Sequence, residues 1–347
     1  MKAALFEAFR QPLFLTDLPD PAPAPDGVVV EVRATGICRS DWHGWMGHDG
    51  DVQPPQVPGH ELAGVVAAVG REVKNWQAGD RVTVPFCLGC GSCPLCRRGD
   101  QQICDRYYQP GFTGPGSFAE YVALPFADTN LVRLPESLSY VDAALLGCRF
   151  VTAYRAVVAL GRPRPGDWVA VHGCGGVGLS AVMIARQSGA RVIAVDIDEA
   201  TLALARDLGA EFTLNARSVD DIPSAVRELS GGGVHVSLDA LGSTETCLNS
   251  IAGLRKRGRH LQVGLMTGEH QAPPIPLGPV IARELEILGS HGIQAHQYPP
   301  LLELITSGRL QPQRLLSKTV TLEEGMRELM AMHHFRHPGV VVIDRFA

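Results

Sequence analysis

The segment 168–178 has the sequence WVAVHGCGGVG. Its first five residues form the apolar pattern of a buried strand, and the glycines that follow fit the spacing G-x-G-x-x-G. A helical run begins at Leu179, directly after this turn. Glycines with this spacing permit a tight turn and let backbone N–H groups approach a pyrophosphate at the helix N-terminus. The segment therefore predicts a strand–turn–helix unit that binds a dinucleotide through Gly173, Gly175, Gly176, Val177 and Gly178.

A carboxylate stands where such a unit needs one. Asp196 directly follows the next strand-like run, 191–195, at about the 20-residue separation that the dinucleotide fingerprint requires. A carboxylate in this place accepts hydrogen bonds from the adenosine ribose hydroxyls and repels a 2′-phosphate. The predicted cofactor is therefore NAD rather than NADP.

The alternation of strands and helices continues along the middle of the chain. Helical patterns follow at 179–188 and 199–208, and further strand patterns at 234–238, 259–263 and 285–288. Such alternation is typical of a parallel, doubly wound α/β sheet.

The two ends of the chain have a different character. Up to about residue 147, short β-branched runs are separated by Pro and Gly, and no sustained helical period is visible. After residue 289 the chain shows two helical runs and a final strand, at 299–307, 322–333 and 340–343. We expect both ends to lie outside the doubly wound sheet.

Composition and charge exclude some classes of partner. The 347 residues include 31 Lys and Arg against 36 Asp and Glu, a formal net charge of −5. This mild acidity disfavours a nucleic-acid partner, because no excess of cations is available to neutralise phosphates. We also expect no membrane partner and a cytoplasmic location, because no secretory signal and no apolar run of spanning length is visible.

Five of the nine cysteines crowd into the segment 87–104. Cys90, Cys93, Cys96 and Cys104 have the spacing C-x2-C-x2-C-x7-C, and Cys87 is a fifth candidate for four places. Crowding of this kind in a large chain indicates metal binding rather than disulfides. Four thiolates form the closed tetrahedral shell of a structural zinc site.

Two more motifs follow apolar, strand-like runs. One is 36–41, with the sequence GICRSD, and the other is 59–61, with the sequence GHE. One cysteine and one histidine do not by themselves define a metal site, since a buried histidine is more often structural.

Taken together, the constellations resemble the zinc-containing alcohol dehydrogenases of the medium-chain dehydrogenase/reductase family. The run that begins GHELAG at Gly59 and continues to Gly70 and Val73 is similar to the signature G-H-E-x2-G-x5-G-x2-V. The resemblance covers essentially the whole chain. It implies an α/β protein with a GroES-like β-barrel catalytic domain at 1–147 and 290–347, which carries a zinc lobe at about 87–104. A doubly wound Rossmann domain that binds NAD is expected at 148–289.

The resemblance also implies roles for individual residues. Cys38, His60 and Cys148 would bind a catalytic zinc, with Glu61 behind it as a transient ligand, and Cys90, Cys93, Cys96 and Cys104 would bind a structural zinc, making two per chain. Ser40 and His43 would relay the proton, and Asp41 would orient His60. Arg39 would meet the cofactor pyrophosphate and Thr152 the nicotinamide. One departure is Val340, which stands where family members often carry an arginine that reaches the pyrophosphate.

The activity that the resemblance implies is NAD-linked oxidation of a small-molecule alcohol by a homo-oligomer, a tetramer or dimer. Two other classes stay open. One is a polyol, threonine or formaldehyde dehydrogenase of the same fold, although Cys148 disfavours polyols because those relatives usually carry Glu there. The other is a non-enzymatic protein that binds NAD and zinc, which the intact proton relay disfavours.

Overall fold

The computed structural model describes residues 1–334 and 338–346 and divides the chain into two compact units. The first comprises Met1–Val151 and Gly292–Ala347, and the second Thr152–His291. The sequence-based boundaries, at 148 and 289, differ by a few residues. The reason is that one continuous helix, Tyr140–Gly161, passes through the first boundary without a turn. Cys148 therefore belongs to the first unit.

This helix is long and apolar enough to cross a membrane by length and composition alone. The expectation that no segment has this length was therefore wrong. However, 72% of its most apolar window is buried inside the protein, as in the core helix of a globular domain.

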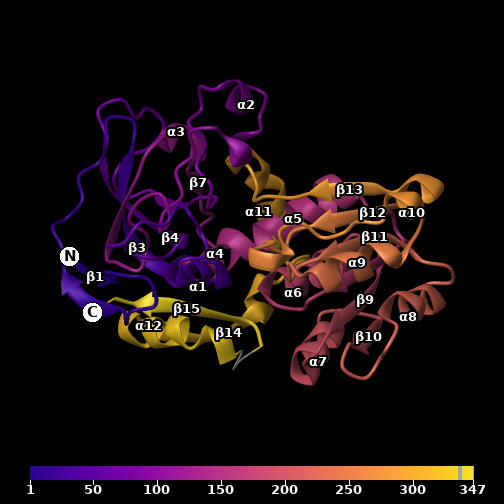
Figure 1. Cartoon of the computed structure of the whole chain (residues 1–347). Helices are drawn as coiled ribbons and strands as arrows, with labels where there is room; N and C mark the ends of the chain where they lie inside the picture. Colours follow the sequence, from indigo (N-terminus) through magenta and orange to yellow (C-terminus); the bar gives the residue numbers. More distant parts are fainter. Residues whose placement is uncertain (335–337, 347) are drawn as a thin grey trace. The chain divides into compact units, whose positions relative to one another are not determined.

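The first unit is built around a mixed sheet with the strand order β14-β15-β3-β4-β5-β7, in which β6 also pairs with β3. Figure 1 labels β3, β4, β7, β14 and β15 of this sheet. A separate antiparallel pair joins β1 to β2. The strands of this unit are β1 Lys2–Leu5, β2 Phe14–Asp17, β3 Val28–Gly36, β4 Glu61–Val69, β5 Arg81–Thr83, β6 Tyr121–Leu124, β7 Val132–Arg133, β14 Leu316–Thr321 and β15 Val340–Arg345. Alternate residues of the central strand β3 (Val28, Val30 and Val32) are buried in an apolar cluster with Leu62 and Val66 of β4.

The helices that accompany this sheet are α1 Arg39–Met46, α2 Pro94–Arg97, α3 Ala127–Asn130, α4 Tyr140–Leu145, α5 Val151–Tyr154, α11 Tyr298–Thr306 and α12 Leu322–Met330. The last two coincide with the helical runs predicted at 299–307 and 322–333, whereas the helices before residue 147 were not predicted. Between α4 and α5 the helix widens into a π-type turn, Leu146–Phe150. Most of these helices are too short to show a period of 3.6 residues, so pattern analysis missed them before residue 147.

The second unit is a six-stranded parallel sheet with the order β10-β9-β8-β11-β12-β13. Its strands are β8 Trp168–His172, β9 Arg191–Asp196, β10 Phe212–Asn215, β11 Val234–Asp239, β12 Leu254–Gln262 and β13 Glu286–Gly289. This is the strand order of the dinucleotide-binding fold, with the topological switch point between β8 and β11. The predicted doubly wound sheet is confirmed.

The helices of the second unit are α6 Gly176–Gln187, α7 Glu199–Asp207, α8 Ile222–Leu229, α9 Thr244–Ala252 and α10 Leu277–Arg283. The sequence analysis did not predict α8, α9 and α10. Capping signals were present for two of them: Asp221 accepts from the Ser224 N–H before α8, and Ser243 forms a capping box before α9.

Candidate active site

The register between β3 and β4 brings two distant motifs together. Gly36, the last residue of β3, pairs with Glu61, the first residue of β4. Cys38 follows one strand by two residues and His60 immediately precedes the other. The antiparallel pairing therefore places the GICRSD and GHE motifs at the same end of the sheet.

The π-type turn of the long helix supplies a further donor. Cys148 lies in Leu146–Phe150, which packs against β4. The potential ligand atoms of Cys38, His60, Glu61 and Cys148 all lie within 4.8 Å of one another. Turns of this kind are frequent at functional sites, because they re-aim one side chain within a helix.

His60 is held in the orientation of a metal ligand. Its side chain is fully buried, and Nδ1 lies 2.8 Å from Oδ1 of Asp41. The same carboxylate accepts from the backbone N–H groups of Gly59 at 3.0 Å and Cys38 at 2.9 Å. Nε2 of His60 is buried and has no hydrogen-bond partner within the described residues. An orphaned nitrogen that faces two sulfurs fits a zinc ion, whose usual ligands are imidazole and thiolate.

Electrostatics favour a charged donor set. A hydrogen bond from the Cys148 thiol, with further help from His60, lowers the pKa of Cys38 well below its ordinary value. The same contact raises the pKa of Cys148, so one of the two sulfurs is held as a thiolate. Burial alone would lower the pKa of His60, but the charge and hydrogen bond of Asp41 raise it.

Glu61 is paired with a residue that the sequence analysis missed, Arg149. The guanidinium Nε lies 2.9 Å from Oε1 of Glu61, and Nη2 contacts Oε2. Both side chains are buried. Burial raises the pKa of Glu61 to about 7, against the opposing charge of Arg149. A lone arginine inside the apolar run 143–151 could have been noticed, because a buried cation needs a partner.

Tyr298, at the start of α11, is a second residue that the sequence analysis missed. Its side chain is fully buried, and its hydroxyl has no partner within the described part of the chain. Burial, with smaller contributions from Cys148 and Glu61, raises its pKa, so the hydroxyl keeps its proton as a hydrogen-bond donor.

The predicted relay residues lie on α1, beside the donor set. The hydroxyl of Ser40 lies 3.7 Å from Sγ of Cys38. His43 follows one helical turn later, and its Nδ1 lies 3.0 Å from Nδ1 of His48, an exposed histidine that the sequence analysis did not single out. Burial, with the charges of Arg39 and His48, lowers the pKa of His43 to about 4. His43 is therefore neutral near pH 7.

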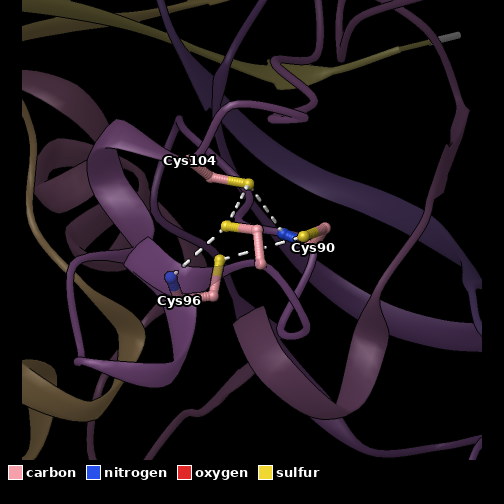
Figure 2. Close-up of side chains that lie close together, drawn as sticks. Cys90, Cys96 and Cys104 are labelled. Carbon is pink, nitrogen blue, oxygen red and sulfur yellow. Dashed lines mark hydrogen bonds between the residues drawn. The ribbon is translucent and has the colours of Figure 1, made fainter.

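The cysteine lobe forms a second donor set (Figure 2). Cys90 and Cys96 have their sulfurs 4.0 Å apart, and Cys93 and Cys104 have theirs 3.7 Å apart. These distances are too long for a disulfide. They agree with the edge of about 3.8 Å that Zn–S bonds of 2.3 Å give in a tetrahedron. The fifth candidate, Cys87, is buried but is not a member of this group.

The lobe also supplies donors to its sulfurs. Backbone N–H groups of Cys90 and Arg106 point at Sγ of Cys104, each at 3.3 Å. The Arg106 guanidinium lies 3.4 Å from Sγ of Cys90. Despite some burial, hydrogen bonds from Ser92 and Cys93 lower the pKa of Cys90 to about 5. These contacts favour the thiolate form that zinc binds.

In the second unit, the glycine turn lies at the carboxyl end of β8. A Cβ on Gly178 would lie 1.9 Å from the carbonyl oxygen of Gly173, so only glycine permits this close approach of helix and strand. Gly173 itself has a φ of 83°. Asp196 ends the neighbouring strand β9, and its carboxylate accepts from the N–H of Cys174 at 2.6 Å and of Ile197 at 2.7 Å. The predicted acid and the predicted turn are therefore adjacent.

The two remaining predicted cofactor residues belong to different units. Thr152 is the first residue of the second unit, and its buried hydroxyl has no hydrogen-bond partner within the described residues. Arg39 belongs to the first unit, where it stacks on the Trp42 ring at 3.9 Å and donates to the carbonyl of Met332 at 2.6 Å.

Comparison with known proteins identifies a zinc-binding dehydrogenase. The model of the alcohol dehydrogenase GroES-like domain matches residues 24–136, and that of the zinc-binding dehydrogenase matches residues 176–307. An alcohol dehydrogenase from Geobacillus stearothermophilus is 36% identical over 293 residues, 84% of each chain. An NAD-dependent alcohol dehydrogenase from Sulfurisphaera tokodaii is 32% identical over 99% of each chain. The chain belongs to the zinc-type alcohol dehydrogenases of the medium-chain dehydrogenase/reductase family.

Two further relatives show the breadth of this similarity. The solved structure of an alcohol dehydrogenase from Thermus sp. ATN1 covers 100% of both chains with a TM-score of 0.90 and 34% identity. An L-threonine 3-dehydrogenase from Streptomyces avermitilis is 33% identical over 95% of this chain and 94% of its own length. The fold of a GroES-like domain with a Rossmann domain is thus confirmed, whereas the particular alcohol differs among relatives.

Proposed function

We propose that the protein reversibly oxidises a simple alcohol to an aldehyde or ketone with hydride transfer to NAD. One observation carries the proposal: Cys38, Cys148 and the unpaired Nε2 of His60 converge in a buried donor set with a hydroxyl beside it. When bound, zinc supplies a Lewis acid that acidifies an alcohol or polarises a carbonyl, and NAD supplies the hydride acceptor.

The chain's own residues handle the proton. Ser40, next to Cys38, would accept the proton of the substrate hydroxyl, and His43 on the same face of α1 would take it onward. The low pKa of His43 keeps its imidazole neutral near pH 7, so it would pass the proton onward rather than hold it. The contact between His43 and the exposed His48 offers a route from there to solvent.

The cofactor is proposed to be NAD rather than NADP. Support comes from the adjacency of Asp196 to the turn that contains Gly173 and Gly178, since a carboxylate there repels a 2′-phosphate. Asp198 and Glu199, which follow at the start of α7, add negative charge near the carboxyl end of β9. Arg39 would meet the pyrophosphate and Thr152, with its unpaired hydroxyl, the nicotinamide.

We further propose two zinc ions per chain, one in each donor set. The four sulfurs of Cys90, Cys93, Cys96 and Cys104 leave no position for a substrate, so this site is structural. The set around His60 has three strong ligands and is the catalytic one.

A homo-oligomer in the cytoplasm is proposed for the whole protein. Strand β13 ends the parallel sheet, and close to it in the chain Leu277, Ile281 and Ile287 are 65%, 76% and 37% exposed. Exposed apolar side chains near a strand edge that is unpaired among the described residues favour pairing with a second copy, as a dimer or tetramer. None of the nine cysteines, all of them among the described residues, forms a disulfide, which supports a reducing compartment. Sedimentation velocity of the protein and of Ile281→Glu tests the assembly.

The test of the activity is NADH formation across primary, secondary, aromatic and polyol substrates, with L-threonine as a further arm and NADP in place of NAD as another. We expect turnover of simple alcohols with NAD that a chelator abolishes. Preference for L-threonine or NADP would contradict the finer assignment, and absence of all turnover would favour a binding protein.

A further inference from the structure

The buried donor set holds one more ligand than a catalytic zinc needs. The ligand atom of Glu61 lies within 4.8 Å of those of Cys38, His60 and Cys148. Four protein ligands would close the tetrahedral shell, whereas a catalytic site keeps one position open. A site built from these residues therefore needs a device that keeps the carboxylate away from the metal.

Arg149 has the geometry of such a device. Its guanidinium engages both oxygens of Glu61, with Nε 2.9 Å from Oε1 and Nη2 on Oε2. The backbone N–H groups of Cys148 and Arg149 also donate to Oε1, at 3.2 and 3.3 Å. A bidentate guanidinium–carboxylate pair fixes orientation as well as charge. Both carboxylate oxygens of Glu61 are thus hydrogen-bonded to Arg149, the residue that follows Cys148 in the chain.

Two glycines leave room for the side chain of Glu61 in this pair. A Cβ on Gly36 would lie 2.1 Å from Oε2 of Glu61, and a Cβ on Gly147 would lie 2.4 Å from its Cβ. The strand and the helix therefore close on the side chain from two directions. Packing this tight restricts the alternative positions of the carboxylate.

Arg149 also supplies positive charge to a site that is rich in anions. With zinc bound, Cys38 and Cys148 would be thiolates, and the buried carboxylates of Glu61 and Asp41 would add two further negative charges. A zinc ion would supply two positive charges, and Arg149 supplies one more. Without the arginine, the unpaired carboxylate would find its nearest cation in the metal.

We propose that Arg149 is a positioning residue that holds Glu61 off the catalytic zinc and so keeps the fourth coordination position open. The proposal rests on the proposed function, since it assumes that zinc binds to Cys38, His60 and Cys148. It assigns to this arginine control over access to the metal rather than contact with the substrate.

The test is the binding of imidazole, a probe that needs the open position, to the cobalt-substituted protein, followed by its visible absorption spectrum. In Arg149→Met we expect Glu61 to coordinate the metal and imidazole to bind roughly 10-fold more weakly or worse, because only the uncoordinated fraction is competent. A crystal structure of the zinc form should place a carboxylate oxygen about 2.0–2.2 Å from zinc. Arg149→Lys, which keeps one positive charge, should restore binding in part.

The double variant Arg149→Met, Glu61→Gln decides the mechanism, since it removes the competing ligand and the unpaired charge together. We expect its imidazole affinity to return to within about 3-fold of the unaltered protein. The matched control is Arg191→Met, which removes an exposed arginine–glutamate pair in the other unit and should change nothing. Unchanged imidazole binding in Arg149→Met, or no rescue in the double variant, would overturn the proposal.

These outcomes separate the proposal from the assigned activity. Failure of the unaltered protein to bind metal at this site, or to oxidise alcohols, counts against the proposed function. If the unaltered protein binds metal and oxidises alcohols, but Arg149→Met binds imidazole as tightly as the unaltered protein, only the role of Arg149 is contradicted. If Arg149→Met fails to fold, Arg149→Lys and the double variant carry the same measurement.

Discussion

The two cysteine-containing donor sets differ in how the chain assembles them. In the lobe, Cys90 and Cys104 are only 14 residues apart, and the intervening turns bring four sulfurs together. In the site around His60, Glu61 and Cys148 are 87 residues apart and meet only because β3, β4 and the long helix pack together. Local sequence thus encodes one site, and tertiary topology encodes the other.

The two sites also differ in what surrounds them. The lobe offers four sulfurs, with an exposed arginine, Arg106, beside one of them. The other site is buried, and its three strong ligands are accompanied by an acid that is paired with a buried arginine. We conclude that the first arrangement suits a permanent structural ion and the second an ion that must exchange ligands.

The largest expected effect is the loss of activity when a ligand of the site around His60 is replaced. In Cys148→Ser, kcat/KM for alcohol oxidation should fall by at least about 10³-fold, because a catalytic metal ligand is lost. Zinc counted by mass spectrometry should fall from two ions to one per chain. The control is Cys87→Ser, a buried cysteine outside both donor sets, which should keep both ions. Retention of two zinc ions by Cys148→Ser would contradict the ligand assignment.

The next effect concerns stability. In Cys96→Ser, the lobe should lose its zinc, and the thermal unfolding midpoint should fall by roughly 10 °C, because a structural ion contributes directly to folding. Cys148→Ser should change the midpoint much less. Differential scanning calorimetry of both variants makes the comparison. Equal destabilisation by the two variants would mean that the sites do not divide their roles.

A smaller effect is expected from the groups that support each donor set. Asp41→Asn removes the carboxylate that orients His60 and should lower zinc affinity at that site by about 10- to 100-fold. Arg106→Met removes only an exposed contact to Cys90 and should lower affinity in the lobe by less than about 3-fold. Competition with a chelator measures both. A larger loss of zinc affinity in Arg106→Met than in Asp41→Asn would show that the buried site does not depend on its neighbouring groups more strongly than the lobe does.

The smallest effect lies in the second unit, where stability depends on a buried neutral histidine. Burial, with the charge of His260, lowers the pKa of His172 to about 3. A depressed pKa stabilises the fold above the unfolded-state pKa of about 6.5, and this stability is lost as pH falls below it. Between pH 8 and 5.5 the loss is about 1.4 kcal/mol.

His172→Gln should therefore show a flatter pH dependence of unfolding than the unaltered protein. Urea unfolding of both at several pH values between 8 and 5.5 measures the difference. If the free energy of unfolding fell equally in both proteins as the pH is lowered, His172 would not have the low pKa that its burial implies.

Much of the second unit and of the lobe could be predicted from the sequence, because their determinants are local. Trp168–His172 coincides with β8, and the glycine turn and Asp196 lie at adjacent strand ends. The four cysteines of the lobe were identified from spacing, although spacing alone left Cys87 as a fifth candidate and only the family resemblance set it aside.

The site around His60 could be proposed only through family resemblance, and part of it could not be proposed at all. Arg149, Tyr298 and His48 carry no local motif, and their importance follows from what they face in three dimensions. The helix Tyr140–Gly161 also hid the boundary between the units, since no turn marks it.

The most direct test of two zinc ions with separate roles is stepwise chelation. Aliquots taken during dialysis against a chelator would be assayed for NADH formation, and zinc would be counted in the same aliquots by native mass spectrometry. We predict two ions per chain at the start and loss of activity in proportion to the first ion lost, while the second stays with the folded protein. A single ion without turnover, or full activity after the first ion has left, would contradict the account.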